Sequence, residues 1–244
     1  MIKADQPNCF PSNIVVSVSS RTDGTVLDRA VGIHDPNIVT NRTKFCEVNG
    51  ISYGDVVFHR IIYDDERSYN VIAEVDSGAT TKFTSEVVAD ALFTRAKNVG
   101  MLLPIADCVA TVFYDPDKQF LALAHLGRHS TLAGLSTRLV NHFRANGSSS
   151  SQIIVWMSPS AKRETYKLEW FDREQDPDWK DFFDKKQDGY YLDLPGYNYH
   201  QLLRAGLSAD NIYISPIDTV TSPDYFSHSS GDISDRIAVL VMMR

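Results

Sequence analysis

The stretch from Gly100 to Gly134 constrains the fold more than any other part of this 244-residue chain. It holds two apolar runs of the kind found in buried strands, LLPIADC and FLALAH, which end at Cys108 and His125. Between them, residues 115–117 (DPD) interrupt the apolar pattern as a turn would. Strands that end on a thiol and an imidazole, with a glycine loop after the second, predict the floor of a functional site.

A third potential ligand, His59, ends another apolar run, GDVVFH. Three protein ligands of mixed His and Cys type are the donor set of a catalytic zinc site, which keeps its fourth position for water or substrate. The residues alone also allow another interpretation, since the chain has no local His-x-x-His or Cys-x-x-Cys pair. Cys108 is then a buried core cysteine and His125 a core histidine bonded to the backbone.

Strand and helix signals alternate along the rest of the chain. NIVVSVSS, VVFHRIIYD, IIVWMSP and DRIAVLVMM are typical of strands. Segments 37–50, 130–147 and 192–206 favour helices that end at a glycine. The segment 170–186, dense in charges and aromatic rings, is expected to be a lid-like excursion with helical character. We therefore predict a layered α/β/α fold with a mixed β-sheet, as one domain over residues 1–244.

Composition limits the environment and the partners. With 43% hydrophobic residues the chain can bury a sizeable core, and its net charge of −7 argues against nucleic acid as a partner. Its three cysteines are odd in number and widely spaced, which is typical of a reducing compartment. The N-terminus MIKADQPNCFPSN lacks the apolar segment of a signal peptide, and no window approaches 18 apolar residues. We expect a cytoplasmic protein that does not bind membranes.

Residues 89–134 resemble the signature block of the YfiH-like laccase-domain family. That block reads DA-x-x-T, then G-x-x-L-x-I-x-x-ADC, then a strand that ends in HAGWRGT-x-x-G. In the same order this chain has Asp90-Ala91, Thr94, Gly100, Ala106-Asp107-Cys108, Asp115, His125, Gly127, Thr131 and Gly134. Similar segments on either side, such as VGIHDPNIVTNRTKFCEVNGI and DYFSHSSGDISDRIAVLVMM, extend the resemblance over nearly the whole chain.

The resemblance implies an enzyme that acts on a purine nucleoside and phosphate by phosphorolysis, with adenosine deamination as a second activity. It implies a zinc ion held by His59, Cys108 and His125, and a monomer or small homo-oligomer. Cys108 and His125 are then also the catalytic residues, with Asp107 either orienting a ligand histidine or capping a loop. The candidate cationic contacts to the substrate are Arg42, Arg128, His129 and Arg236.

The chain departs from the family at positions expected to grip the substrate. HLGRHST replaces HAGWRGT, so that Arg128 and His129 take the places of a tryptophan and a basic residue. The family's paired arginines near the C-terminus are His228 and Ser229 here. An imidazole at position 129 lacks the permanent bidentate charge of a guanidinium. We therefore expect Arg128 to take over a contact to phosphate.

Three alternatives stay open at this point. A copper-dependent polyphenol oxidase would use the same soft donors, but a multicopper centre needs more ligands than seven histidines without His-x-His pairs supply, which favours zinc. A metal-free Cys–His pair would make a hydrolase or amidase acting on peptidoglycan precursors. The altered substrate positions are also compatible with a catalytically impaired family member.

Overall fold

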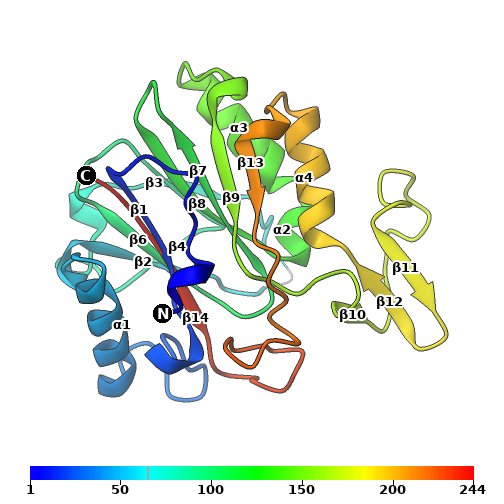
Figure 1. The fold of residues 1–244 in the computed structure, drawn as a ribbon, viewed down its shortest axis with the longest axis horizontal. Coiled ribbons are helices and arrows are strands. Elements are labelled where there is room, and N and C mark those ends of the chain that lie inside the picture. The colour runs from blue at the N-terminus through cyan, green and yellow to red at the C-terminus, as the bar shows by residue number, and fades with distance from the viewer. Residues whose placement is uncertain (65) are drawn as a thin grey trace.

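Two stacked β-sheets form the body of the protein in the computed structural model, which describes residues 1–64 and 66–244 (Figure 1). The five-stranded sheet has the order β1 (Ile14–Val18), β14 (Ile237–Met243), β6 (Gly100–Ile105), β2 (Val56–Arg60) and β4 (Val87–Val88). The six-stranded sheet has the order β13 (Ile212–Ile214), β9 (Ile154–Met157), β7 (Val109–Asp115), β8 (Phe120–Leu126), β5 (Ala91–Thr94) and β3 (Ile72–Glu74). Each sheet mixes parallel and antiparallel pairs.

The apolar runs of the sequence are explained by strands that are covered on both faces. In β14, Val239 and Val241 belong to the core between the sheets, whereas Ala238 and Leu240 pack in the core under a helix. Strands β6 and β7 are likewise buried along their whole length. A strand with two covered faces reads as a continuous hydrophobic run instead of an alternating one.

Helices cover the outer faces. α1 (Pro36–Val48) packs on the five-stranded sheet, and α3 (Leu135–Ala145) and α4 (Leu194–Arg204) pack on the six-stranded sheet beside the short α2 (Arg128–Leu132). Asp35 begins α1 by accepting hydrogen bonds from the amides of Asn37 and Ile38. Short 3₁₀ turns occupy Lys3–Asp5, Arg21–Asp23, Tyr53–Asp55, Ser77–Ala79, Ser150–Gln152 and Ala209–Asn211.

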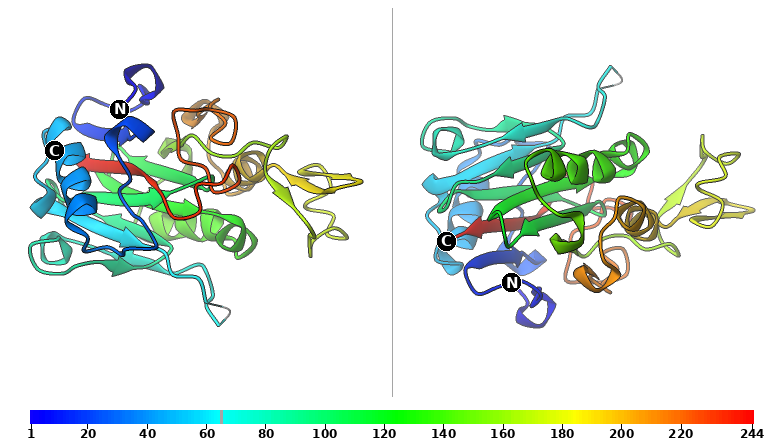
Figure 2. Two further views of the ribbon diagram at one scale, coloured as in Figure 1. Left: turned by 90° about the horizontal axis from the view of Figure 1, so that it is seen from below. Right: turned by 90° about the horizontal axis from the view of Figure 1, so that it is seen from above.

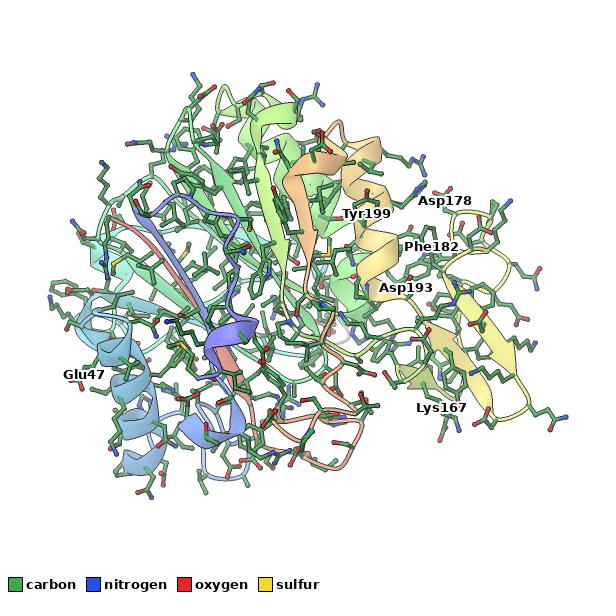
Figure 3. All side chains as sticks on the ribbon, viewed as in Figure 1. Glu47, Lys167, Asp178, Phe182, Asp193 and Tyr199 are labelled. Atoms are coloured by element: carbon green, nitrogen blue, oxygen red, sulfur yellow. The ribbon has the colours of Figure 1, made fainter. Side chains whose placement is uncertain are left out.

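A third, smaller sheet projects from this body as an arm (Figure 2). It has the order β10 (Lys167–Leu168), β12 (Gly189–Leu192) and β11 (Phe183–Lys186). The Phe182 ring lies 5.3 Å from that of Tyr197, and Asp178 pairs with Arg204 at 3.2 Å, so that the arm is fastened to α4 (Figure 3).

The mixed α/β class predicted from the sequence is confirmed, with two stacked sheets where the pattern suggested one. The helices expected over 37–50 and 192–206 correspond to α1 and α4. The helix expected over 130–147 is instead two helices, α2 and α3, separated at Gly134, whose φ of 71° is left-handed.

The helical character predicted for residues 170–186 is wrong, because this segment consists of turns and strand β11. Its charges pair across the arm, as Lys185 does with Glu174 at 2.7 Å, while Phe171 and Trp179 turn inward and are buried. Within residues 1–64 and 66–244, no helix combines the length and apolar content needed to cross a lipid bilayer.

The core between the sheets provides a test of the fold. We expect Val241→Ala in β14, where the side chain is fully buried, to lower the free energy of unfolding by about 2 kcal/mol. Val88→Ala in β4, where the side chain is 41% exposed, is the matched control and should change it by less than about 0.5 kcal/mol. Urea denaturation measures both, and equal effects would contradict the packing described here.

Candidate active site

A cavity of about 240 Å³ lies where the end of β2, the turn between β6 and β7, and the end of β8 meet. His59, Cys108 and His125 all line it, although the first and the last lie 66 positions apart in the sequence. The lining also includes polar and aromatic side chains from distant loops: Arg29, Tyr63, Asp107, Tyr166, His228, Ser229 and Arg236.

Gly127 lets Cys108 and His125 approach each other. A Cβ atom at position 127 would lie 3.0 Å from Cys108 Sγ and 2.8 Å from His125 Cε1, closer than side chains tolerate. Any residue with a side chain would therefore push one of the two out of place. The glycine of the predicted loop is thus required by the site itself.

The ring of His59 is held in one tautomer. Its Nε2 lies 3.0 Å from the carbonyl oxygen of Ala89, which can only accept, so that Nε2 carries the proton. Nδ1 then carries a lone pair, and this buried atom has no hydrogen-bond partner among the described residues. Burial lowers the pKa of His59 to about 4, which keeps the ring neutral at physiological pH.

His125 is also kept neutral. Burial, with a smaller contribution from the nearby His59 and Arg29, lowers its pKa to about 3. The backbone of His125 is fixed on both sides, since its amide donates to Asp90 at 2.9 Å and its carbonyl accepts from the Ser130 hydroxyl at 2.6 Å. Neutral imidazoles on a fixed backbone are suited to donate lone pairs.

Cys108 is a protonated thiol in this environment. Burial, with a smaller contribution from the carboxylate of Asp107, raises its pKa to about 11. Only a thiolate attacks carbon or binds metal well. Cys108 therefore needs either a cation beside it or a base stronger than these histidines to become reactive at neutral pH.

Asp107 holds three loops around the cavity. Its carboxylate accepts from the Thr219 hydroxyl at 2.8 Å and from the Ser229 amide at 2.7 Å, and its carbonyl oxygen accepts from the Ala161 amide at 3.0 Å. Its φ of 70° forms the tight turn before Cys108. Of the two roles considered for this residue, these contacts correspond to the capping of loops.

The cations at the cavity differ from those expected. Arg236 lines it as predicted, with Nη1 donating to the carbonyl of Ile233 at 3.1 Å, and burial lowers its pKa. Arg29 and Tyr63, which sequence reasoning did not single out, lie together there, with the guanidinium carbon 5.1 Å from the ring centre. Both come from irregular loops, where a single sequence carries no periodic signal.

Three predicted substrate contacts do not line this cavity. Arg128 lies 5.6 Å from the ring centre of Trp170, and His129 stacks on Tyr69 at 4.7 Å. Arg42 belongs to the buried side of α1, where its guanidinium donates to the carbonyl oxygens of Val26 and Ile33. Arg128 and His129 still flank the site, because they begin α2 three residues after His125 and His129 lies 6.0 Å from the Tyr63 ring, whereas Arg42 belongs to a different region.

The donors have the chemistry of a metal site without its finished geometry. Two neutral imidazoles, one with an unpartnered buried Nδ1, and a thiol beside them are a suitable set for zinc or copper. In the described part of the chain, however, no three His, Cys, Asp or Glu side chains are arranged closely enough to hold a metal ion. The three side chains therefore fit a metal site in the type of their donor atoms and in lining the same cavity.

The comparison with protein families identifies the group to which this chain belongs. The family model for multi-copper polyphenol oxidoreductase laccase matches residues 17–244. The chain is a member of this laccase-domain family. The match includes every element around the cavity and confirms the resemblance derived from the signature block.

The relatives of this chain are named purine nucleoside phosphorylases, not laccases. The chain is 27% identical to the purine nucleoside phosphorylase YlmD of Bacillus subtilis, over 83% of this chain and 76% of that protein. It is 24% identical to the purine nucleoside phosphorylase SSP1584 of Staphylococcus saprophyticus, over 88% and 86% of the two chains. The crystal structure of YlmD from Geobacillus stearothermophilus has the same fold, with a TM-score of 0.81, 23% identity, and 98% and 94% of the chains covered.

The contacts of Asp107 predict how its substitutions behave. Asp107→Asn keeps one acceptor and tolerates a positive φ, and we expect it to change the free energy of unfolding by less than about 1 kcal/mol. Asp107→Ala loses both acceptors and should cost about 3 kcal/mol. Chemical denaturation of the two variants is the measurement. Equal destabilisation by both would contradict the assignment of Asp107 to loop capping.

Proposed function

We propose that this protein is a zinc-dependent purine nucleoside phosphorylase that also deaminates adenosine. One observation carries the proposal: a single cavity is lined by His59, Cys108 and His125 together with the two cations Arg29 and Arg236. Phosphorolysis needs an anion site beside a site for a planar base, and this cavity offers residues suited to both. The names of the relatives from Bacillus and Staphylococcus support the same reaction.

The phosphate would bind between Arg29 and Arg236. A guanidinium presents paired N–H donors that match phosphate oxygens, and a partly buried position strengthens each charge-assisted bond. Arg236 is buried and anchored by loop carbonyls, and Arg29 is exposed on the neighbouring loop, where its amide donates to the Ser234 carbonyl at 3.3 Å. Phosphate held there would be oriented to attack the anomeric carbon of ribose as the purine leaves.

The nucleoside would bind against the aromatic side of the same cavity. Tyr63 and Tyr166 supply rings with hydroxyl groups, and burial raises the pKa of each phenol, so that both stay protonated donors. Leu27 and Ile61 complete an apolar wall. Rings and a few polar groups of this kind are typical of sites that bind small planar ligands.

His59 Nδ1, Cys108 Sγ and the His125 ring would hold the zinc ion. Zinc held there would lower the pKa of water to about 7, which supplies the nucleophile that hydrolytic deamination needs. The raised pKa of Cys108 favours this proposal over a metal-free Cys–His nucleophile, because zinc binding would displace the thiol proton into solvent. Copper in these positions would instead support a polyphenol oxidase.

Elemental analysis tests the metal. We expect near-stoichiometric zinc in the purified protein, and its loss in both His59→Ala and Cys108→Ala. Cys46→Ala is the matched control, since Cys46 is a buried cysteine in the core under α1 and should leave the zinc in place. Copper in place of zinc would favour the oxidase. A metal-free protein with a rapidly alkylated Cys108 would favour the hydrolase.

Steady-state kinetics tests the phosphate site. Because one charge-assisted contact is lost, Arg29→Ala should raise the KM for phosphate in inosine phosphorolysis by about 10- to 100-fold. Arg128→Ala, with the same loss of charge next to the site, should change it by less than about threefold. The reverse result would assign the phosphate contact to Arg128. Deamination of adenosine without phosphate should persist in Arg29→Ala, since that reaction consumes water.

A further inference from the structure

A second pocket, of about 370 Å³, lies between α1 and the loop that follows Ala79. We call it the α1 pocket; its lining includes Arg42, Tyr53, Lys82, Phe83, Thr84 and Ser85. It shares no lining residue with the cavity that holds His59, Cys108 and His125. Nothing in the proposed reaction uses it.

Arg42 is the unusual side chain of this pocket, since it is only 2% exposed. Its guanidinium donates to the carbonyl oxygens of Val26 at 2.6 Å and Ile33 at 2.9 Å, and to the Tyr53 hydroxyl at 3.2 Å. The ring of Phe58 lies 3.9 Å from the guanidinium carbon. Nη2 is buried and has no hydrogen-bond partner among the described residues.

None of these contacts neutralises the charge of Arg42. Its partners are two carbonyls, one phenol and one ring, and no ion pair within residues 1–64 and 66–244 includes it. Burial raises the pKa of Tyr53, so that this phenol is not an anion. Buried charges are normally paired, because desolvation of a lone ion costs several kcal/mol.

An anion in the α1 pocket would lie beside the guanidinium of Arg42, since Arg42 is one of the residues that line the pocket. Ile33 and Tyr53 line it as well, and they take up both N–H groups of Arg42 Nη1. Nη2 is therefore the nitrogen that is left to bind an anion. Lys82 supplies a second cation; its half-exposed amine pairs with Asp55, a surface contact that costs little to exchange. Ser85 is exposed on the rim.

We propose that the α1 pocket binds a phosphate group, with Arg42 as the buried cation and Lys82 as the cation at the rim. The group can come from inorganic phosphate or from a phosphate ester. Phe83 lines the same pocket and is 73% exposed, which gives the base of a nucleoside monophosphate a ring on which to stack.

Titration calorimetry tests this site apart from the phosphorylase site. In an Arg29→Ala background, which removes a contact proposed for the other cavity, we expect inorganic phosphate still to bind. Adding Ser85→Glu, which puts a carboxylate on the rim of the α1 pocket, should weaken that binding at least about tenfold. Ser77→Glu is the control, because it makes the same change at an exposed serine outside the pocket.

The outcomes separate the two proposals. Equal phosphate binding by the Ser85→Glu and Ser77→Glu proteins, or no phosphate binding in the Arg29→Ala background, would overturn the α1 site. Unchanged phosphorolysis kinetics in Ser85→Glu, together with its weakened binding, would support it. Arg42→Met should abolish binding where circular dichroism shows a folded protein. If adenosine monophosphate binds about tenfold tighter than inorganic phosphate and loses that gain in Phe83→Ala, the ligand of the pocket is a phosphate ester. Equal affinities for the two identify inorganic phosphate as the ligand.

Discussion

Packing of two β-sheets against each other, with helices outside both, governs the rest of this structure. Strands β2 and β6 belong to one sheet and β8 to the other, so that the inter-sheet core brings their ends to one edge. His59, Cys108 and His125 meet there because each comes at or just after the end of one of these strands. The residues of the cavity are therefore held in place by strands that are buried on both faces.

Burial also determines the protonation states around the cavity. It lowers the pKa of both histidines and raises that of Cys108, so that all three side chains are neutral at physiological pH. Neutral donors with an unpartnered Nδ1 are matched to a cation, while Arg29 and Arg236 at the same cavity are matched to an anion. The cavity thus contains residues suited to a cation and residues suited to an anion. The proposed attack of phosphate on a metal-polarised substrate would require both.

The departures from the family signature change how the mouth of the cavity is built. Arg128 lies over Trp170 and His129 over Tyr69, so that these two residues pack against rings and not into the cavity. His228 and Ser229 line the cavity where the family has paired arginines, and the amide of Ser229 is tied to Asp107. Cationic contacts come instead from Arg236 and from Arg29, which lies on a loop far away in the sequence.

The sequence by itself determined the mixed α/β class, helices α1 and α4 and the buried strands, and it singled out three residues that line one cavity, because periodicity, glycine stops and apolar runs are local signals. It could not determine that two sheets stack, that the charged segment 170–186 forms a β-arm, or that Arg29 reaches the cavity while Arg42 does not. These depend on which side chains pair across long separations, as Lys167 and Asp188 do in the arm. Only the tertiary structure decides such pairings, since the physical cause of each is a partner that the local sequence does not contain.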